Sequence, residues 1–216
     1  MNEFDIKAAE WDNNPMHRER SEAIADGIID SIPLNREMKV LEFGAGTGIS
    51  SFLIKDRVKE ITLMDNSSEM VKVMNEKIRA SHATNLKALN FNLELSDYND
   101  EKFDLIITQM VLHHVNEIGL IISRFKKLLN QGGYLAIADL YTEDGSFHGP
   151  GFTGHKGFDI AELSGLLGKH SFINITSGKC YVINKKISDD VTKQFDVFLM
   201  IATRDTENTP GSAKSS

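Results

Sequence analysis

A run of glycines that follows an apolar segment near residue 40 is the feature of the sequence best suited to hold a ligand. It reads Leu41-Glu42-Phe43-Gly44-Ala45-Gly46-Thr47-Gly48. Glycines at alternate positions after a strand let the backbone turn sharply and approach a bound molecule closely. The spacing differs from the dinucleotide pattern G-x-G-x-x-G, because Ile49 occupies the place of the third glycine. The run therefore predicts a ligand-binding turn and disfavours a dinucleotide.

The acid that precedes these glycines, Glu42, restricts the charge of the ligand. A dinucleotide would bring its pyrophosphate here, and two like charges about 4 Å apart cost roughly 4 kcal/mol at an effective dielectric of 20. The ammonium and sulfonium groups of S-adenosylmethionine (SAM) would instead gain from a nearby carboxylate. The alternative is that Glu42 only accepts hydrogen bonds from backbone amides of the turn.

A second acid, Asp65, ends the next apolar run and follows Gly44 by about 20 residues. At this place in nucleotide-binding sheets, an acid can accept hydrogen bonds from both ribose hydroxyls. Asp65 could equally cap a helix that begins near Ser67. Taken together with Glu42 and the glycine turn, the ribose role is favoured.

Alternating strands and helices are expected to position these residues. Apolar spacing predicts helices over 15–32, 49–55, from 67 and over 118–130, and strands over 40–43, 60–64, 85–90, 103–108 and 134–138. Gly132 and Gly133 are expected to close the last of these helices. Such alternation implies a parallel sheet covered by helices on both faces.

The pattern changes after Asp139, where a long glycine-rich loop over 141–158 begins. A helix over 159–169 follows. Two β-like runs, 172–183 and 195–203, then have no long crossover between them, so they should pair antiparallel as a hairpin.

We expect a single domain over residues 1–204, with a helical cap segment over 1–33 and a polar, disordered tail over 205–216. The chain has 216 residues and a net charge of −7, which argues against nucleic acid or an anionic membrane as partner. A single cysteine excludes an internal disulfide, and no signal peptide or membrane span is evident, so a cytoplasmic protein is expected. The oligomeric state stays open.

Four motifs in order resemble those of class I SAM-dependent methyltransferases of the small-molecule type, methyltransferase domain 11/25-like. They are the glycine turn, the run Met64-Asp65-Asn66-Ser67-Ser68-Glu69-Met70, the strand and exit over 102–115, and the run Leu129-Asn130-Gln131-Gly132-Gly133-Tyr134-Leu135. The resemblance covers about residues 38–140. It implies a three-layer α/β Rossmann-like methyltransferase fold, whose seven-stranded, mostly parallel sheet ends in a C-terminal antiparallel hairpin. It also implies methyl transfer from SAM to a small-molecule acceptor.

The resemblance assigns to the cofactor Glu42, Gly44, Ala45, Gly46, Gly48, Asp65, Asn66, Met70, Asn92, Leu93, Gln109 and Met110. Glu42 would lie near the methionine amino group, and Asp65 would hold the ribose. The adenine amino group would meet Asn92, with Asp97 as the alternative. Gln109 and Met110 would lie beneath the sulfonium.

Methyl transfer requires a positioned acceptor and, for a hydroxyl or amine, removal of a proton. The candidate catalytic residues are His114, at the exit of the fourth strand, and His148 and His155, in the glycine-rich loop. This loop would act as a lid over the substrate. The segment around Trp11 would fold over the site in the same way.

No metal is expected, because His113, His114, His148 and Asp139 lack the compact ligand spacing of known metal motifs. The fourth strand is not followed by an Asn/Asp-Pro-Pro-aromatic motif, which further disfavours nucleic-acid substrates. Two alternatives to the methyltransferase remain: a catalytically silent SAM-binding subunit and, less favoured, a nicotinamide-dependent dehydrogenase.

Overall fold

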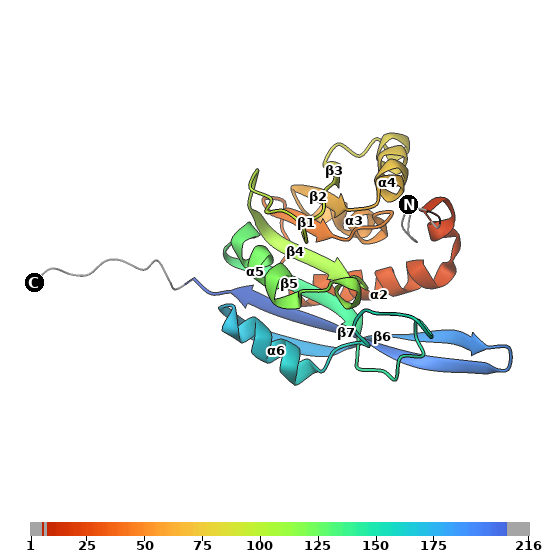
Figure 1. Ribbon diagram of the computed structural model, residues 1–216. Coiled ribbons are helices and arrows are strands. Elements are labelled where there is room, and N and C mark those ends of the chain that lie inside the picture. The colour runs from red at the N-terminus through yellow and green to blue at the C-terminus, as the bar shows by residue number, and fades with distance from the viewer. Residues whose placement is uncertain (1–5, 7, 207–216) are drawn as a thin grey trace, which may run out of the picture.

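A computed structural model describes residue 6 and residues 8–206, and in these residues a seven-stranded sheet lies between two layers of helices (Figure 1). The strands are β1 (Lys39–Phe43), β2 (Glu60–Asp65), β3 (Leu86–Asn90), β4 (Phe103–Gln109), β5 (Leu129–Leu140), β6 (Phe172–Ser188) and β7 (Val191–Arg204). The helices are η1 (Ala8–Asn13), α2 (Pro15–Ser31), α3 (Ile49–Ile54), η2 (Lys55–Arg57), α4 (Ser68–Ser81), η3 (Leu112–His114), α5 (Ile118–Leu128) and α6 (Ile160–Lys169). Of the predicted disordered tail, residues 207–216 lie outside the described residues.

The strand order across the sheet is β3-β2-β1-β4-β5-β7-β6. The first five strands run parallel, whereas β7 lies antiparallel between β5 and β6. This is the mostly parallel sheet with a C-terminal antiparallel hairpin that the sequence predicts, and the predicted three-layer Rossmann-like architecture is confirmed.

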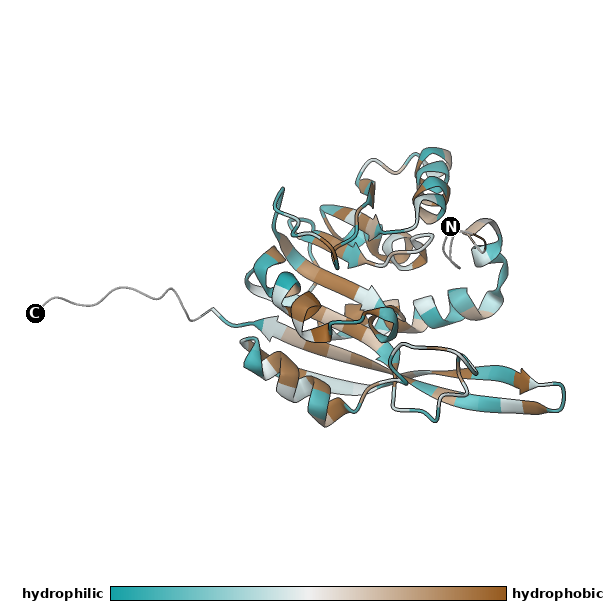
Figure 2. Ribbon diagram, in the orientation of Figure 1, coloured by the Kyte–Doolittle hydropathy of each residue, from teal (hydrophilic) through white to brown (hydrophobic). Residues whose placement is uncertain are grey.

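Two apolar cores cover the two faces of the sheet. On one face α5 and α6 pack through residues such as Phe125 and Leu167, which are fully buried. On the other face α2, α3 and α4 contribute residues such as Ile28, Ile54 and Met74. The central strands are accordingly hydrophobic along most of their length (Figure 2), as expected for strands buried on both sides.

The predicted helix over 118–130 is too long. Helix α5 ends at Leu128, and β5 begins at once with Leu129. The register of pairing between β4 and β5 shifts between Phe103 and Leu105. The glycines predicted to cap the helix therefore lie in an irregularity at the start of β5. Gly132 adopts a φ of 72° there, which a residue without a Cβ tolerates at little cost.

The C-terminal hairpin is longer than the sequence predicts, since β6 continues to Ser188 and β7 begins at Val191. The added part is mostly polar and extends past the rest of the sheet (Figures 1 and 2). Polar residues on both faces hide the alternation by which strands are recognised, and this is why the extension was missed. No helix in the described part of the chain is both long and apolar enough to span a membrane.

Candidate functional site

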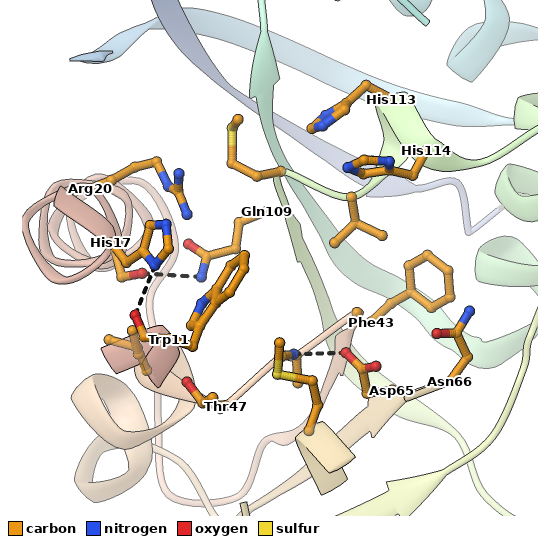
Figure 3. A pocket seen from close by; sticks show the side chains of 18 of the residues that line it. Trp11, His17, Arg20, Phe43, Thr47, Asp65, Asn66, Gln109, His113 and His114 are labelled. Atoms are coloured by element: carbon orange, nitrogen blue, oxygen red, sulfur yellow. Dashed lines mark hydrogen bonds between the residues drawn. The ribbon is translucent and has the colours of Figure 1, made fainter. Parts of the chain in front are cut away.

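A cavity of about 990 Å³ opens at the carboxyl edge of the parallel strands (Figure 3). Its wall comes from the ends of β1, β2 and β4, from η3, from the N-terminal segment, from the glycine-rich loop and from the hairpin extension. Small-molecule sites commonly measure about 300–1,000 Å³, so the volume can take a nucleoside cofactor together with a second small molecule.

The glycine turn forms part of this wall through Gly44, Ala45 and Gly46. Gly44 and Gly46 have φ angles of 68° and 57°, in the left-handed region that side chains disfavour. A Cβ on Gly44 would lie 2.4 Å from a methyl carbon of Val111, so the turn packs directly against the exit of β4. Both glycines are therefore required by the backbone.

Two residues predicted to bind the cofactor, Glu42 and Gly48, do not line the cavity. Gly48 precedes α3 with a φ of 81°, and a Cβ there would lie 2.5 Å from Leu63 Cδ2. Glu42 is 1% exposed and accepts hydrogen bonds from the backbone N–H of Ser51, at 3.2 Å, and from the Ser51 hydroxyl. Its other oxygen, Oε1, is buried without a hydrogen-bond partner among the described residues. Burial raises the pKa of Glu42 to about 7.

Asp65 lines the cavity and at the same time holds the backbone around it. Its Oδ2 accepts a hydrogen bond from Gly46 N–H at 2.8 Å, and its Oδ1 accepts one from Ser67 N–H at 2.8 Å. A carboxylate offers about four acceptor positions, so these two bonds leave capacity for ligand hydroxyls. The cap of α4 is Ser67, whose hydroxyl accepts a hydrogen bond from Met70 N–H at 3.1 Å, so Asp65 supports the turn before this helix and does not cap it.

Beyond Asp65, the cavity is lined by Asn66, Met70, Asn92 and Leu93. Asp97, the alternative to Asn92, lies elsewhere and pairs with Arg124 at 2.7 Å and with Lys127 at 3.2 Å. The hydrogen bond from Arg124 is the main reason that the pKa of Asp97 is lowered. Of the two candidates, only Asn92 reaches the cavity.

The N-terminal segment closes one side of the cavity. Trp11 stacks on His17, with ring centroids 4.2 Å apart, and His17 Nδ1 lies 2.9 Å from the Trp11 carbonyl oxygen (Figure 3). Asp12 accepts a hydrogen bond from the Thr47 hydroxyl at 2.5 Å and pairs with Lys77 at 2.6 Å. The segment is thereby fastened to both the glycine turn and α4.

Arg20 is a functional candidate that the sequence reasoning missed. It lies on α2, is 6% exposed, and lines the cavity near Gln109 (Figure 3). Its Nε is buried without a hydrogen-bond partner among the described residues. Burial lowers the pKa of Arg20 to about 10, although the negative charge of Asp139 acts to raise it. Arg20 therefore remains a cation at neutral pH. One signal was available, since Arg20 stands one helical turn before Ile24 on the apolar face.

Three histidines, His113, His114 and His148, gather at the other end of the cavity and are called the histidine cluster below. His113 is 1% exposed, and its Nδ1–H donates to Asp139 Oδ1 at 2.6 Å. The remaining catalytic candidate, His155, does not line the cavity. Its Nε2 lies 3.0 Å from the Val115 carbonyl oxygen, where the ring supports the loop.

Comparisons with known proteins show the family of the chain. A family model described as a methyltransferase domain matches residues 34–150. An uncharacterized methyltransferase of Schizosaccharomyces pombe is 31% identical over 153 residues, which are 63% of this chain and 54% of that protein. This chain therefore spans about half the length of that relative.

Two solved structures share the fold at low sequence identity. The YcgJ protein of Bacillus subtilis superposes with a TM-score of 0.70 at 16% identity, over 86% of this chain and 99% of that chain. A SAM-dependent methyltransferase of Aquifex aeolicus gives a TM-score of 0.61 at 19% identity, over 83% and 89% of the two chains.

Glu42 should make the stability of the protein depend on pH. Its folded pKa of about 7 exceeds the ordinary value of 4.5, so the folded state binds this proton more tightly than the unfolded state. Stability from this group is complete below pH 4.5 and is lost as the pH rises to about 7, by up to roughly 3 kcal/mol. Urea unfolding of the wild type and of Glu42→Gln at pH 5 and pH 8 measures the effect. We expect the variant to gain stability relative to the wild type at pH 8, and an unchanged difference would contradict the assignment.

Proposed function

Because this chain belongs to the class I SAM-dependent methyltransferases, we propose that it methylates a small-molecule acceptor held at the histidine cluster. The observation that carries the proposal is that one continuous cavity is lined both by the glycine turn and Asp65 and by His114 and His148. A cofactor and an acceptor bound there would be neighbours in a common enclosure.

The residues around the glycine turn fit SAM. The backbone of Gly44 and Gly46 can be approached closely, and Asp65 retains acceptor positions for the two ribose hydroxyls. Asn66, Met70 and Asn92 would border the adenine. When bound, SAM supplies a methyl carbon that the sulfonium activates for in-line displacement.

The methionine end of the cofactor needs partners for an ammonium and a carboxylate. Since Glu42 lies behind the wall, Gln109 is the better acceptor for the ammonium, because its buried Oε1 has no hydrogen-bond partner among the described residues. Its amide Nε2 donates to Ser21 Oγ at 3.2 Å, which orients the oxygen. Arg20 would pair with the carboxylate, since a buried cation is costly unless an anion meets it.

The acceptor would lie between the histidine cluster and the segments that close the cavity. Trp11 and His17 cover it from the N-terminal side, while Phe147 and Lys185 cover it from the loop and the hairpin. Such an enclosure favours a small molecule over a protein side chain or a nucleic acid. The chief alternative is a SAM-binding subunit without turnover, and the experiments below distinguish the two.

Removal of the Asp65 carboxylate should weaken cofactor binding. Charge-assisted hydrogen bonds contribute about 1.5–3 kcal/mol each, so Asp65→Ala should bind SAM and its demethylated product at least about tenfold more weakly in calorimetric titrations. Asp97→Ala is the matched control, because it removes an exposed carboxylate outside the cavity, and it should bind like the wild type. A wild-type protein that binds neither compound would overturn the proposed function.

Arg20→Gln should weaken SAM binding by about ten- to a hundredfold, because the cofactor carboxylate would lose a buried charged partner. Arg18→Gln, which removes an exposed arginine from the same helix, serves as control and should have no effect. Thermal unfolding of both variants checks that α2 remains folded. Equal affinities for the wild type and Arg20→Gln would contradict the role of Arg20.

Methyl transfer should be detectable into a low-molecular-mass acceptor. Incubation with methyl-labelled SAM and size-fractionated cell extract should place the label in the small-molecule fraction. Label in protein or nucleic acid would overturn the proposed acceptor class. Cofactor binding without transfer to any fraction would instead favour the silent subunit.

A further inference from the structure

The histidine cluster has the composition of a metal site. One ring nitrogen from each of His113, His114 and His148 lies within 4.8 Å of the other two. The ring centroids are 4.2 Å apart between His113 and His114, and 5.0 Å apart from His148 to each of them. The residues come from η3 and from the glycine-rich loop, so the cluster exists only in the folded chain.

The nitrogens, up to 4.8 Å apart, are more widely spaced than the ligands around a bound tetrahedral ion. Zinc–nitrogen bonds of about 2.0–2.1 Å place the ligand nitrogens roughly 3.4 Å apart. Side-chain rotations that move the nitrogens by about 1 Å would close the cluster to this spacing. Neutral imidazole is a preferred ligand of zinc and of neighbouring divalent transition metals.

Asp139 supplies the second feature of a built metal site. It is 0% exposed, and its Oδ1 accepts the Nδ1–H of His113 at 2.6 Å. This bond fixes the ring tautomer and leaves Nε2 as the nitrogen that can coordinate. Metal-binding histidines commonly donate their other N–H to a carboxylate in this way, which orients the ring and raises its basicity.

The loop that carries His148 is held in place from several sides. Glu143 Oε2 accepts hydrogen bonds from the backbone N–H groups of Gly145, at 2.7 Å, and Phe147, at 3.1 Å. Lys185 Nζ lies 4.3 Å from the centre of the Phe147 ring, and the ring of Phe152 stacks on His148 with centroids 3.9 Å apart. The third ligand is therefore part of an anchored structure with an apolar surround.

We propose that the histidine cluster binds a divalent transition-metal ion, in the first place Zn²⁺, with His113, His114 and His148 as ligands and Asp139 as the supporting carboxylate. Three protein ligands leave one coordination position open, as in catalytic zinc sites, and the cluster lines the cavity. An acceptor oxygen, nitrogen or sulfur bound there would be oriented and would lose its proton more readily. This use of the metal rests on the proposed function, whereas metal binding itself does not.

Metal binding can be measured directly on the full chain, prepared without a histidine tag and stripped of metal with a chelator. We expect one Zn²⁺ per chain by calorimetry, and Co²⁺ should give the visible absorption of a tetrahedral site. His148→Ala and His114→Ala should each weaken binding by at least about a hundredfold. Asp139→Asn should weaken it by about 10–100-fold, as expected for a supporting carboxylate.

His155→Ala is the matched control, because His155 belongs to the same loop but contacts the Val115 carbonyl oxygen instead of the cluster. It should bind Zn²⁺ like the wild type, and thermal unfolding of every variant checks the fold. The proposal is overturned if the folded wild type binds no Zn²⁺, or if folded His148→Ala binds it as tightly. SAM titration of the same metal-free protein separates the claims, since SAM binding without Zn²⁺ binding refutes the metal site alone.

Discussion

The parallel register of β1, β2, β4 and β5 is the constraint on which the whole site depends. It brings the carboxyl ends of these strands to one edge, so that residues far apart in the chain meet there. Backbone hydrogen bonds continue the alignment past the strand ends. Gly44 N–H donates to the Met64 carbonyl oxygen at 2.9 Å, and Met110 N–H donates to that of Ala138 at 2.8 Å. The glycine turn, Asp65 and the exit of β4 are thus fixed by the sheet itself.

Elements outside the parallel strands convert this open edge into an enclosed cavity. Asp12 connects the N-terminal segment to Thr47 and Lys77, while the glycine-rich loop and the extended hairpin cover the opposite side. Hydrogen bonds among side chains and backbone hold these covers, and a small apolar core around Phe147 lies beneath the loop and the hairpin.

Buried charges are concentrated around the cavity and have different partners. Asp139 is satisfied within the protein by His113, whereas Arg20 has a buried Nε without a hydrogen-bond partner among the described residues. Glu42 differs from both, because burial raises its pKa to about 7 and so favours its neutral form. Arg20 is thus a buried cation on the wall of the cavity, while the His113–Asp139 pair is satisfied within the protein.

The sequence by itself determined the order of strands and helices, the glycine turn and the position of Asp65, because local conformational preferences and motif spacing carry that information. It did not determine where α5 ends, since glycines at a strand irregularity resemble those of a helix cap. The tertiary structure alone decided that Asn92 reaches the cavity while Asp97 does not, that Glu42 lies behind the wall, and that Arg20 lines it. It also brought His148 of the glycine-rich loop to His113 and His114, which are neighbours in the sequence. These outcomes depend on which side chains meet across the fold, such as Asp12 with Lys77, 65 residues apart, and such contacts leave no periodic trace in the sequence.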